Sequence, residues 1–169
     1  GIGITMALPF DIRIAETNAL LSFPFTKLGI LPGLASTHFL PALVGSNKAK
    51  EIIGTSDDLY ESVFKIADWT NNNIEYDLNT LTAEAVLPSS WVLENRQGVC
   101  DEMTNLFISL LRSVGIPARF VSGMVYSNTN YEWGPHGWAE VYFPGEGWVP
   151  FDVTFGEYGW LDPSHLKLK

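Results

Sequence analysis

Apolar residues recur at helical spacing in two stretches of the second half of the chain. An acidic start at 56–58 followed by a stripe of apolar residues through Ile66 predicts a helix over residues 56–71, which ends at the run "NNN". A second stripe predicts a helix over 99–114, ended by Gly115 and Pro117. The members of the second stripe share one helical face: Val99, Met103, Leu106, Phe107, Leu110, Leu111 and Val114. That face needs a sheet or another helix to cover it.

The segments around the second helix have other patterns. Alternating and β-branched residues predict strands over 118–126, 137–143 and 148–155, and "PGEG" at 144–147 predicts a tight hairpin loop between the last two. The stretch "SWVLENRQG" predicts a short helical turn closed by Gly98. A helix followed by antiparallel strands predicts an α+β fold.

The first 55 residues differ from the rest. They contain a helix-compatible run after "GIG", a strand-like "DIRIA", a passage rich in Pro and Gly, and a broken amphipathic helix over 36–53. Residues 1–55 carry four basic and three acidic residues, whereas 56–169 carry six basic and sixteen acidic ones and every Trp and Tyr. This change predicts two segments, 1–55 and 56–169.

Composition narrows the function classes. The chain is 46% hydrophobic and 17% charged, which is typical of a globular protein. A net charge of −9 repels phosphate groups and anionic lipid, so we expect neither a nucleic-acid partner nor a membrane partner. The longest uncharged stretch, 28–47, is interrupted by Pro and Gly and is not a membrane span. A single cysteine cannot form an intrachain disulfide, and a free thiol favours a reducing intracellular compartment. The first residues, "GIGITMALPF", have neither an initiator Met nor a basic leader, so we expect sequence upstream.

That cysteine, Cys100, lies in the first turn of the predicted 99–114 helix. Unpaired amide N–H groups and the helix dipole favour a thiolate there, and the thiolate is the nucleophilic form. Asp101 and Glu102 place negative charge beside it and oppose this effect. Position alone leaves two interpretations, a nucleophile or a small buried core residue.

His136 and Asp152 extend the candidate chemistry. His136 precedes one hairpin strand and Asp152 lies in the next, and a thiol, an imidazole and a carboxylate are the groups used in thiol acyl transfer. A loop centred on Gly145 and Glu146 would pair His136 with Phe155, three residues from Asp152. We therefore expect a bulge, with Pro150 as its place.

The stretches "GVCDEMTNLFISLLRSVGIPARFVSGMVY" and "HGWAEVYFPGEGWVPFDVTFGEYG" resemble the transglutaminase-like superfamily, over about residues 57–169. The resemblance implies a papain-like core in which Cys100 is the nucleophile, His136 the general acid and base, and Asp152 the residue that orients the ring. It also implies a thioester intermediate formed from a carboxamide or peptide bond of a peptide or protein substrate. Water as acceptor would make the protein a protease or amidase, and a lysine amine would make it a cross-linking acyltransferase.

Residues 1–55, from "GIGITMALPFDIRIAE" through "KLGILPG" to "LPALVG", resemble a fragment of the crotonase family of enoyl-CoA hydratases and isomerases. The two positions at which hydratases of that family carry acids hold Thr5 and Phe25, and Ile2 replaces a glycine of the oxyanion turn, so we expect no hydratase activity. A fragment of such a superhelix leaves apolar faces to cover, which favours packing on the second segment, self-association, or an artificial join near residue 55.

Two other functions stay open, a non-catalytic peptide-binding module of the same fold and acyl-CoA binding by the N-terminal segment. We expect the Cys100 amide to serve the oxyanion and Trp91 to pack in the core. Trp138 and Trp148 could line a substrate channel or pack on the sheet. His38 and His165 are expected to be structural or surface residues. No metal or cofactor motif is evident, so none is predicted.

Overall fold

The computed structural model describes residue 16, residues 46–81 and residues 86–169. The features predicted before residue 46, including Ile2, Thr5, Phe25 and His38, lie outside the described residues, as does most of the predicted 36–53 helix. Residues 46–53 are helical, and within them Ala49 is fully buried in the core that the later segments form. The division at residue 55 stays a prediction.

Both strongly periodic helices are present. Helix α3 spans Leu59–Asn73, and Asp58 caps it by accepting a hydrogen bond from the Glu61 amide at 2.7 Å. Helix α5 spans Cys100–Ser113, as its apolar stripe predicts. Between them lie the short strand β1 (Glu75–Tyr76), a 3₁₀ helix η2 (Leu78–Thr80), helix α4 (Ser89–Asn95) and strand β2 (Gln97–Gly98). The short helix does not end at Gly98 as predicted, because Arg96 takes the left-handed conformation at φ 61° and closes it.

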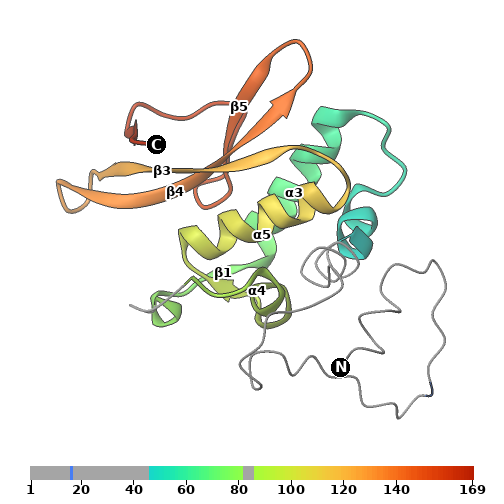
Figure 1. The fold of residues 1–169 in the computed structure, drawn as a ribbon. Coiled ribbons are helices and arrows are strands. Elements are labelled where there is room, and N and C mark those ends of the chain that lie inside the picture. The colour runs from blue at the N-terminus through green and yellow to red at the C-terminus, as the bar shows by residue number, and fades with distance from the viewer. Residues whose placement is uncertain (1–15, 17–45, 82–85) are drawn as a thin grey trace, which may run out of the picture.

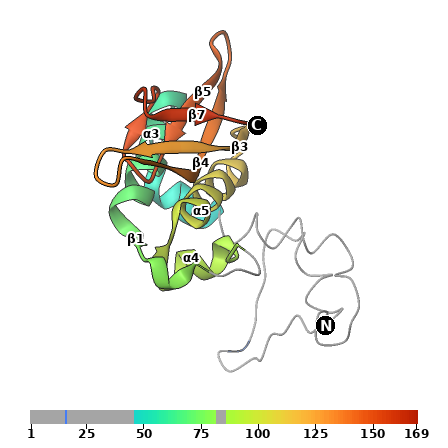
Figure 2. The same cartoon turned by 90° about the vertical axis from the view of Figure 1, so that its left-hand side faces the viewer.

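The remaining strands form one five-stranded antiparallel sheet in the order β6-β5-β4-β3-β7, whereas β1 and β2 pair in parallel. Strand β3 spans Ala118–Ser127, β4 Glu132–Phe143, β5 Gly147–Asp152, β6 Glu157–Tyr158 and β7 His165–Lys167. Helix α5 lies along this sheet, with α3 beside it and α4 and β1 on the side away from the strands (Figure 1). The view turned by 90° shows the same order, with β3, β4, β5 and β7 gathered above α5 (Figure 2).

The core lies between α5 and the sheet. Helix α5 buries Leu106, Phe107 and Leu110, and the strands supply Val141 and Phe151. Fully burying side chains of this kind stabilises the folded state by roughly 1.5–3 kcal/mol each. This packing fixes the axis of α5 against the sheet, and with it the position of the helix start, where Cys100 stands. No helix in the described part of the chain is long and apolar enough to span a lipid bilayer.

The β4–β5 hairpin differs from the predicted register. Phe143 pairs with Gly147, one residue before the Trp148 that a loop centred on Gly145 and Glu146 would give it. Gly145, in the three-residue connection, and Gly147, the first residue of β5, both have positive φ, at 93° and 86°, which favours glycine at these two places. The expected bulge at Pro150 is also wrong, because Pro150 pairs with Glu140 in unbroken register.

Candidate active site

Cys100 is the first residue of α5 and is partly exposed. The residue before it, Val99, is the N-cap and has an aliphatic side chain, so it provides no acceptor for the first amides of the helix. These N–H groups point toward the thiol end of the helix and favour negative charge there. The Sγ atom of Cys100 lies 3.7 Å from Oδ1 of Asp101.

Glu102 holds the approach to the helix in place. Its carboxylate is buried and accepts hydrogen bonds from the amides of Val99 at 3.1 Å and Leu87 at 3.0 Å. Gly98 lies so close to the Glu102 side chain that a Cβ added at Gly98 would meet Cβ of Glu102 at 2.6 Å. The loop that precedes Cys100 is therefore pinned by one buried carboxylate and by one glycine.

We expect Gly98→Ala to destabilise the fold by about 1–3 kcal/mol, because the added methyl group must push Glu102 and the helix start apart. The alkylation rate of Cys100 should change in the same variant, since the thiol moves with the helix start. Denaturant unfolding and labelling kinetics measure both effects. Gly134→Ala is the matched control, because nothing lies within 4 Å of a Cβ added at Gly134. Equal unfolding free energies for the two variants would contradict this prediction.

The first turns of α5 are also tied to β4 next to His136. The hydroxyl of Thr104 donates to the Gly137 carbonyl at 3.1 Å. A Cβ at Gly137 would meet Oδ1 of Asp101 at 2.7 Å, so only glycine permits this approach of strand to helix. These contacts bring the residue next to His136 against the turn that carries Cys100.

His136 and Asp152 form the shortest ion pair of the site. Nε2 of His136 lies 2.6 Å from Oδ2 of Asp152, and the two side chains are 4% and 0% exposed. The second oxygen of Asp152, Oδ1, accepts hydrogen bonds from the amides of Thr154 at 2.8 Å and Phe155 at 3.1 Å. Because Nε2 is occupied by Asp152, Nδ1 is the nitrogen of His136 that remains for Cys100.

Charge in the site favours the protonated ring. Burial opposes the charge on His136, but hydrogen bonds to Asp152 and Cys100 outweigh it and raise the pKa of His136 to about 9. Burial likewise opposes the Asp152 carboxylate, and hydrogen bonds from His136, from His165 and from the Phe155 amide hold its pKa below the usual range. At neutral pH the pair is an imidazolium and a carboxylate.

The two side chains meet diagonally across the hairpin. Ala139 pairs with Phe151, so the same register places Trp138 opposite Asp152 and His136 two residues farther along. Diagonal neighbours on one face lie about 7–8 Å apart at the backbone, which an imidazole and a carboxylate can span. The contact therefore needs no bulge.

His165, which the sequence predicted to be a structural or surface residue, is not on the surface but lies beside the His136–Asp152 pair. Its Nε2 lies 3.0 Å from the same Oδ2 of Asp152, and its side chain is 3% exposed. The strand that begins with it, β7, has three residues, too few to show a period in the sequence. Its pairing with β3 is a contact between distant segments, which no local pattern reveals.

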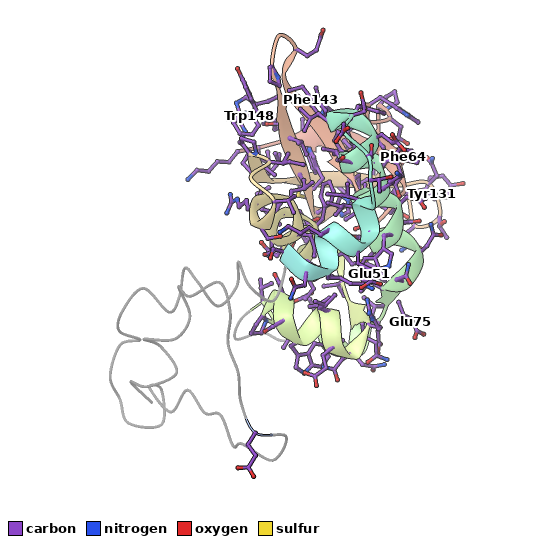
Figure 3. The ribbon with its side chains drawn as sticks, turned by 90° about the vertical axis from the view of Figure 1, so that its right-hand side faces the viewer. Glu51, Phe64, Glu75, Tyr131, Phe143 and Trp148 are labelled. Atoms are coloured by element: carbon purple, nitrogen blue, oxygen red, sulfur yellow. The ribbon has the colours of Figure 1, made fainter. Side chains whose placement is uncertain are left out.

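Aromatic side chains enclose the two rings. Phe155 stacks on His136 with a centroid distance of 4.8 Å, and Trp138 meets His165 edge-on at 5.3 Å. Trp138 is 1% exposed and is therefore packing, not a channel wall. Trp148 lies near the hairpin tip, close to Phe143 (Figure 3). It is far from Glu75, which precedes Tyr76 on strand β1 (Figure 3). Trp91 packs against the core, as predicted.

Tyr76 lies near Cys100 and was not singled out from the sequence. It pairs with Gly98, two residues before Cys100. Burial, followed by the negative charges of Cys100 and Asp101, raises the pKa of its phenol. Tyr76 is 50% exposed, so it borders solvent.

Among the described residues, two groups of side chains offer donor atoms within 4.8 Å of one another, as a metal ion would need. The first is His136, Asp152 and His165, and the second is Glu157, Asp162 and His165. In the first group both rings already make hydrogen bonds to Asp152. A metal ion there would have to displace the protons of both rings.

Comparison with known proteins places this fold in a family. The model of the transglutaminase-like superfamily matches residues 46–153, more than half of the chain. The chain belongs to the transglutaminase-like superfamily. The model of the enoyl-CoA hydratase/isomerase family matches residues 1–61, which agrees with the crotonase-like character of the N-terminal segment.

Relatives match this transglutaminase-like chain in separate parts. The uncharacterized protein YebA of Bacillus subtilis is 31% identical over 118 residues, which cover 59% of this chain and 16% of YebA. Enoyl-CoA hydratase ACTT3 of Alternaria alternata is 47% identical over 55 residues, 32% of this chain and 19% of the hydratase. The chain thus spans less than a fifth of either relative.

Solved structures share the α+β, papain-like arrangement. A candidate cysteine protease of Cytophaga hutchinsonii has a TM-score of 0.58 and 28% identity, over 67% of this chain and 37% of its own. The periplasmic domain of TgpA from Pseudomonas aeruginosa, bound to ethylmercury, has a TM-score of 0.52 and 23% identity, over 68% of this chain and 44% of its own. The second likeness concerns the fold alone.

Proposed function

We propose that residues 56–169 form a thiol-dependent catalytic core that transfers or hydrolyses acyl groups at carboxamide or peptide bonds. Cys100 is the nucleophile, His136 the general acid and base, and Asp152 the group that orients and charges the ring. The observation that carries the proposal is the buried His136–Asp152 pair, 2.6 Å apart, in a ring whose other nitrogen is left for Cys100. Membership of the transglutaminase-like superfamily and the likeness to a candidate cysteine protease support it.

The reaction has two steps. Sγ of Cys100 attacks the carbonyl carbon, the C–N bond breaks, and His136 gives its proton to the departing ammonia or amine, which leaves a thioester. Water or a lysine amine then attacks the thioester, gives a proton to His136, and the C–S bond breaks to restore the thiolate. The acyl group ends as a carboxylic acid or as a new amide. The substrate is accordingly a peptide or protein carboxamide.

The helix start supplies the oxyanion site of this proposal. The tetrahedral intermediate carries its negative charge next to Cys100, where the first amides of α5 point outward. An aliphatic cap at Val99 leaves these donors without a competing side-chain acceptor. Tyr76 lies near enough that negative charge at Cys100 adds to burial in raising the pKa of its phenol.

Alkylation kinetics test the proposal without a known substrate. At pH 6.5 an ordinary thiol is almost wholly protonated, since it ionises near pH 8.5. The imidazolium of His136 beside Cys100 favours negative charge on the sulfur as it attacks, so iodoacetamide should react about tenfold faster than with glutathione at that pH. Labelling is followed by mass spectrometry, and Cys100 is the sole cysteine of the chain. A rate equal to that of glutathione would contradict the proposal.

The pH profile of turnover gives a second test on the same site. His136 acts as an acid only while it is protonated, and its pKa is about 9. We therefore expect kcat/KM to fall as pH rises through about 9, instead of through the 6.5 of an unperturbed histidine.

A further inference from the structure

Strand pairing and burial fix the position of His165. Strand β7 pairs with β3 so that His165 lies opposite Val125, and the Tyr126 amide donates to the Ser164 carbonyl at 3.0 Å. The ring is 3% exposed and meets Trp138 edge-on, with an interplanar angle of 89°. The short strand β7 thus places the imidazole of His165 next to Asp152.

Both nitrogens of this ring face carboxylates. Nε2 lies 3.0 Å from Oδ2 of Asp152, and Nδ1 lies 3.0 Å from Oδ1 of Asp162. Oδ1 of Asp162 also accepts from the Ser164 amide at 2.9 Å and from the Ser164 hydroxyl. The ring of His165 therefore lies between two carboxylates, and its Nε2 donates to Oδ2 of Asp152.

Asp152 is consequently shared by two rings. Its Oδ2 accepts from His136 at 2.6 Å and from His165 at 3.0 Å, while Oδ1 accepts from two backbone amides. The second ring restricts rotation of the carboxylate and adds a second hydrogen-bond donor to Oδ2. A carboxylate oxygen that also accepts from His165 holds the proton of His136 less tightly than one that accepts from His136 alone.

We propose that His165 is a positioning residue, which fixes Oδ2 of Asp152 toward His136 and sets how strongly the carboxylate retains the His136 proton. The expected effect of His165 on turnover rests on the proposed function. The coupling between the two rings is a property of the folded protein and is measurable without turnover.

The test must consider every charged group around the ring. Strand β5 carries Asp152, and β4 carries His136, whose ring centroid lies 5.7 Å from that of His165. The 157–162 segment carries Asp162 and Glu157, and Oε2 of Glu157 lies 3.8 Å from Nδ1 of His165. Removal of the His165 ring takes one donor from Oδ2 of Asp152 and leaves that oxygen to His136 alone.

The experiment compares His165→Phe and His165→Gln with the parent chain. The pKa of His136 is read from its ring resonances by NMR, and kcat is measured where turnover is found. In His165→Phe the His136 pKa should rise by up to about one unit, because Oδ2 of Asp152 then accepts from His136 alone. The kcat should fall about tenfold to a hundredfold, because Asp152 is no longer held in place.

His165→Gln restores a donor to Asp152. A glutamine amide can donate to Asp152 in place of the ring, so kcat should recover to within about threefold and the His136 pKa should return toward that of the parent. Lys167→Gln is the matched control: it lies on the same strand and loses an ion pair to Glu140, 2.6 Å away, that does not touch Asp152. A His136 pKa in His165→Phe equal to that of the parent and of Lys167→Gln would overturn the inference. Slow alkylation of Cys100 in the parent chain would instead count against the proposed function alone.

Discussion

Replacing Cys100 with alanine should remove turnover almost entirely, with a fall of about 10⁴-fold or more, because no other group of the site can form the covalent acyl intermediate. The assays are ammonia release from glutamine peptides, peptide hydrolysis, and incorporation of a fluorescent primary amine into protein. The serine variant should be similarly inactive, since a hydroxyl ionises far less readily than a thiol at neutral pH.

The alanine variant should stay folded. Cys100 is partly exposed and lies in a helix, where alanine is the most favourable residue, so the free energy of unfolding should change by less than about 1 kcal/mol. Circular dichroism and thermal unfolding check this. Residual turnover above one tenth of the parent value would contradict the nucleophile assignment. Peptide binding without turnover, in both the parent and the alanine variant, would favour a binding module.

The helices could be predicted from the sequence because their information is local. The α5 stripe fixes both the helix and its buried face, and through them the position of Cys100 at the helix start. The strands from Ala118 to Asp152 are likewise local, although β4 begins at Glu132, five residues before the predicted 137. Their partners follow from short connections.

The arrangement of the site was harder to predict from the sequence. A shift of one residue in the hairpin depends on whether Gly147 closes the loop or begins the strand, and composition does not decide this. The contact of His136 with Asp152 was predicted from residue types and from a family resemblance, and its diagonal geometry came from the structure. His165 could not be placed because its role depends on a sheet-edge pairing between residues about forty positions apart.

Replacing Asp152 with asparagine should lower kcat by about 10³–10⁴-fold. Asparagine can still accept the Thr154 and Phe155 amides through its oxygen, so the backbone turn is retained. It carries no charge, and burial, which opposes the protonated ring, is the largest influence on His136. The pKa of His136 should therefore drop from about 9 to near or below its ordinary 6.5.

The raised pKa of His136 makes the stability of the fold depend on pH. A histidine whose folded pKa is raised contributes stability that is fully present below pH 6.5 and is lost as pH rises through about 9. The asparagine variant should lack this contribution, so parent and variant should differ most in unfolding free energy at pH 6 and converge above pH 9. Denaturant titrations at several pH values measure the difference.

Thiol labelling connects this variant to the chemistry. With a neutral ring at pH 7, His136 places no positive charge beside the sulfur of Cys100, so iodoacetamide should react at the rate of an ordinary thiol. Asp68→Asn provides the matched control, because it removes the same charge from an exposed position on α3. A His136 that still titrates near pH 9 in Asp152→Asn, with labelling as fast as in the parent, would mean that another group holds the proton. The carboxylate would then have no part in the activation of Cys100.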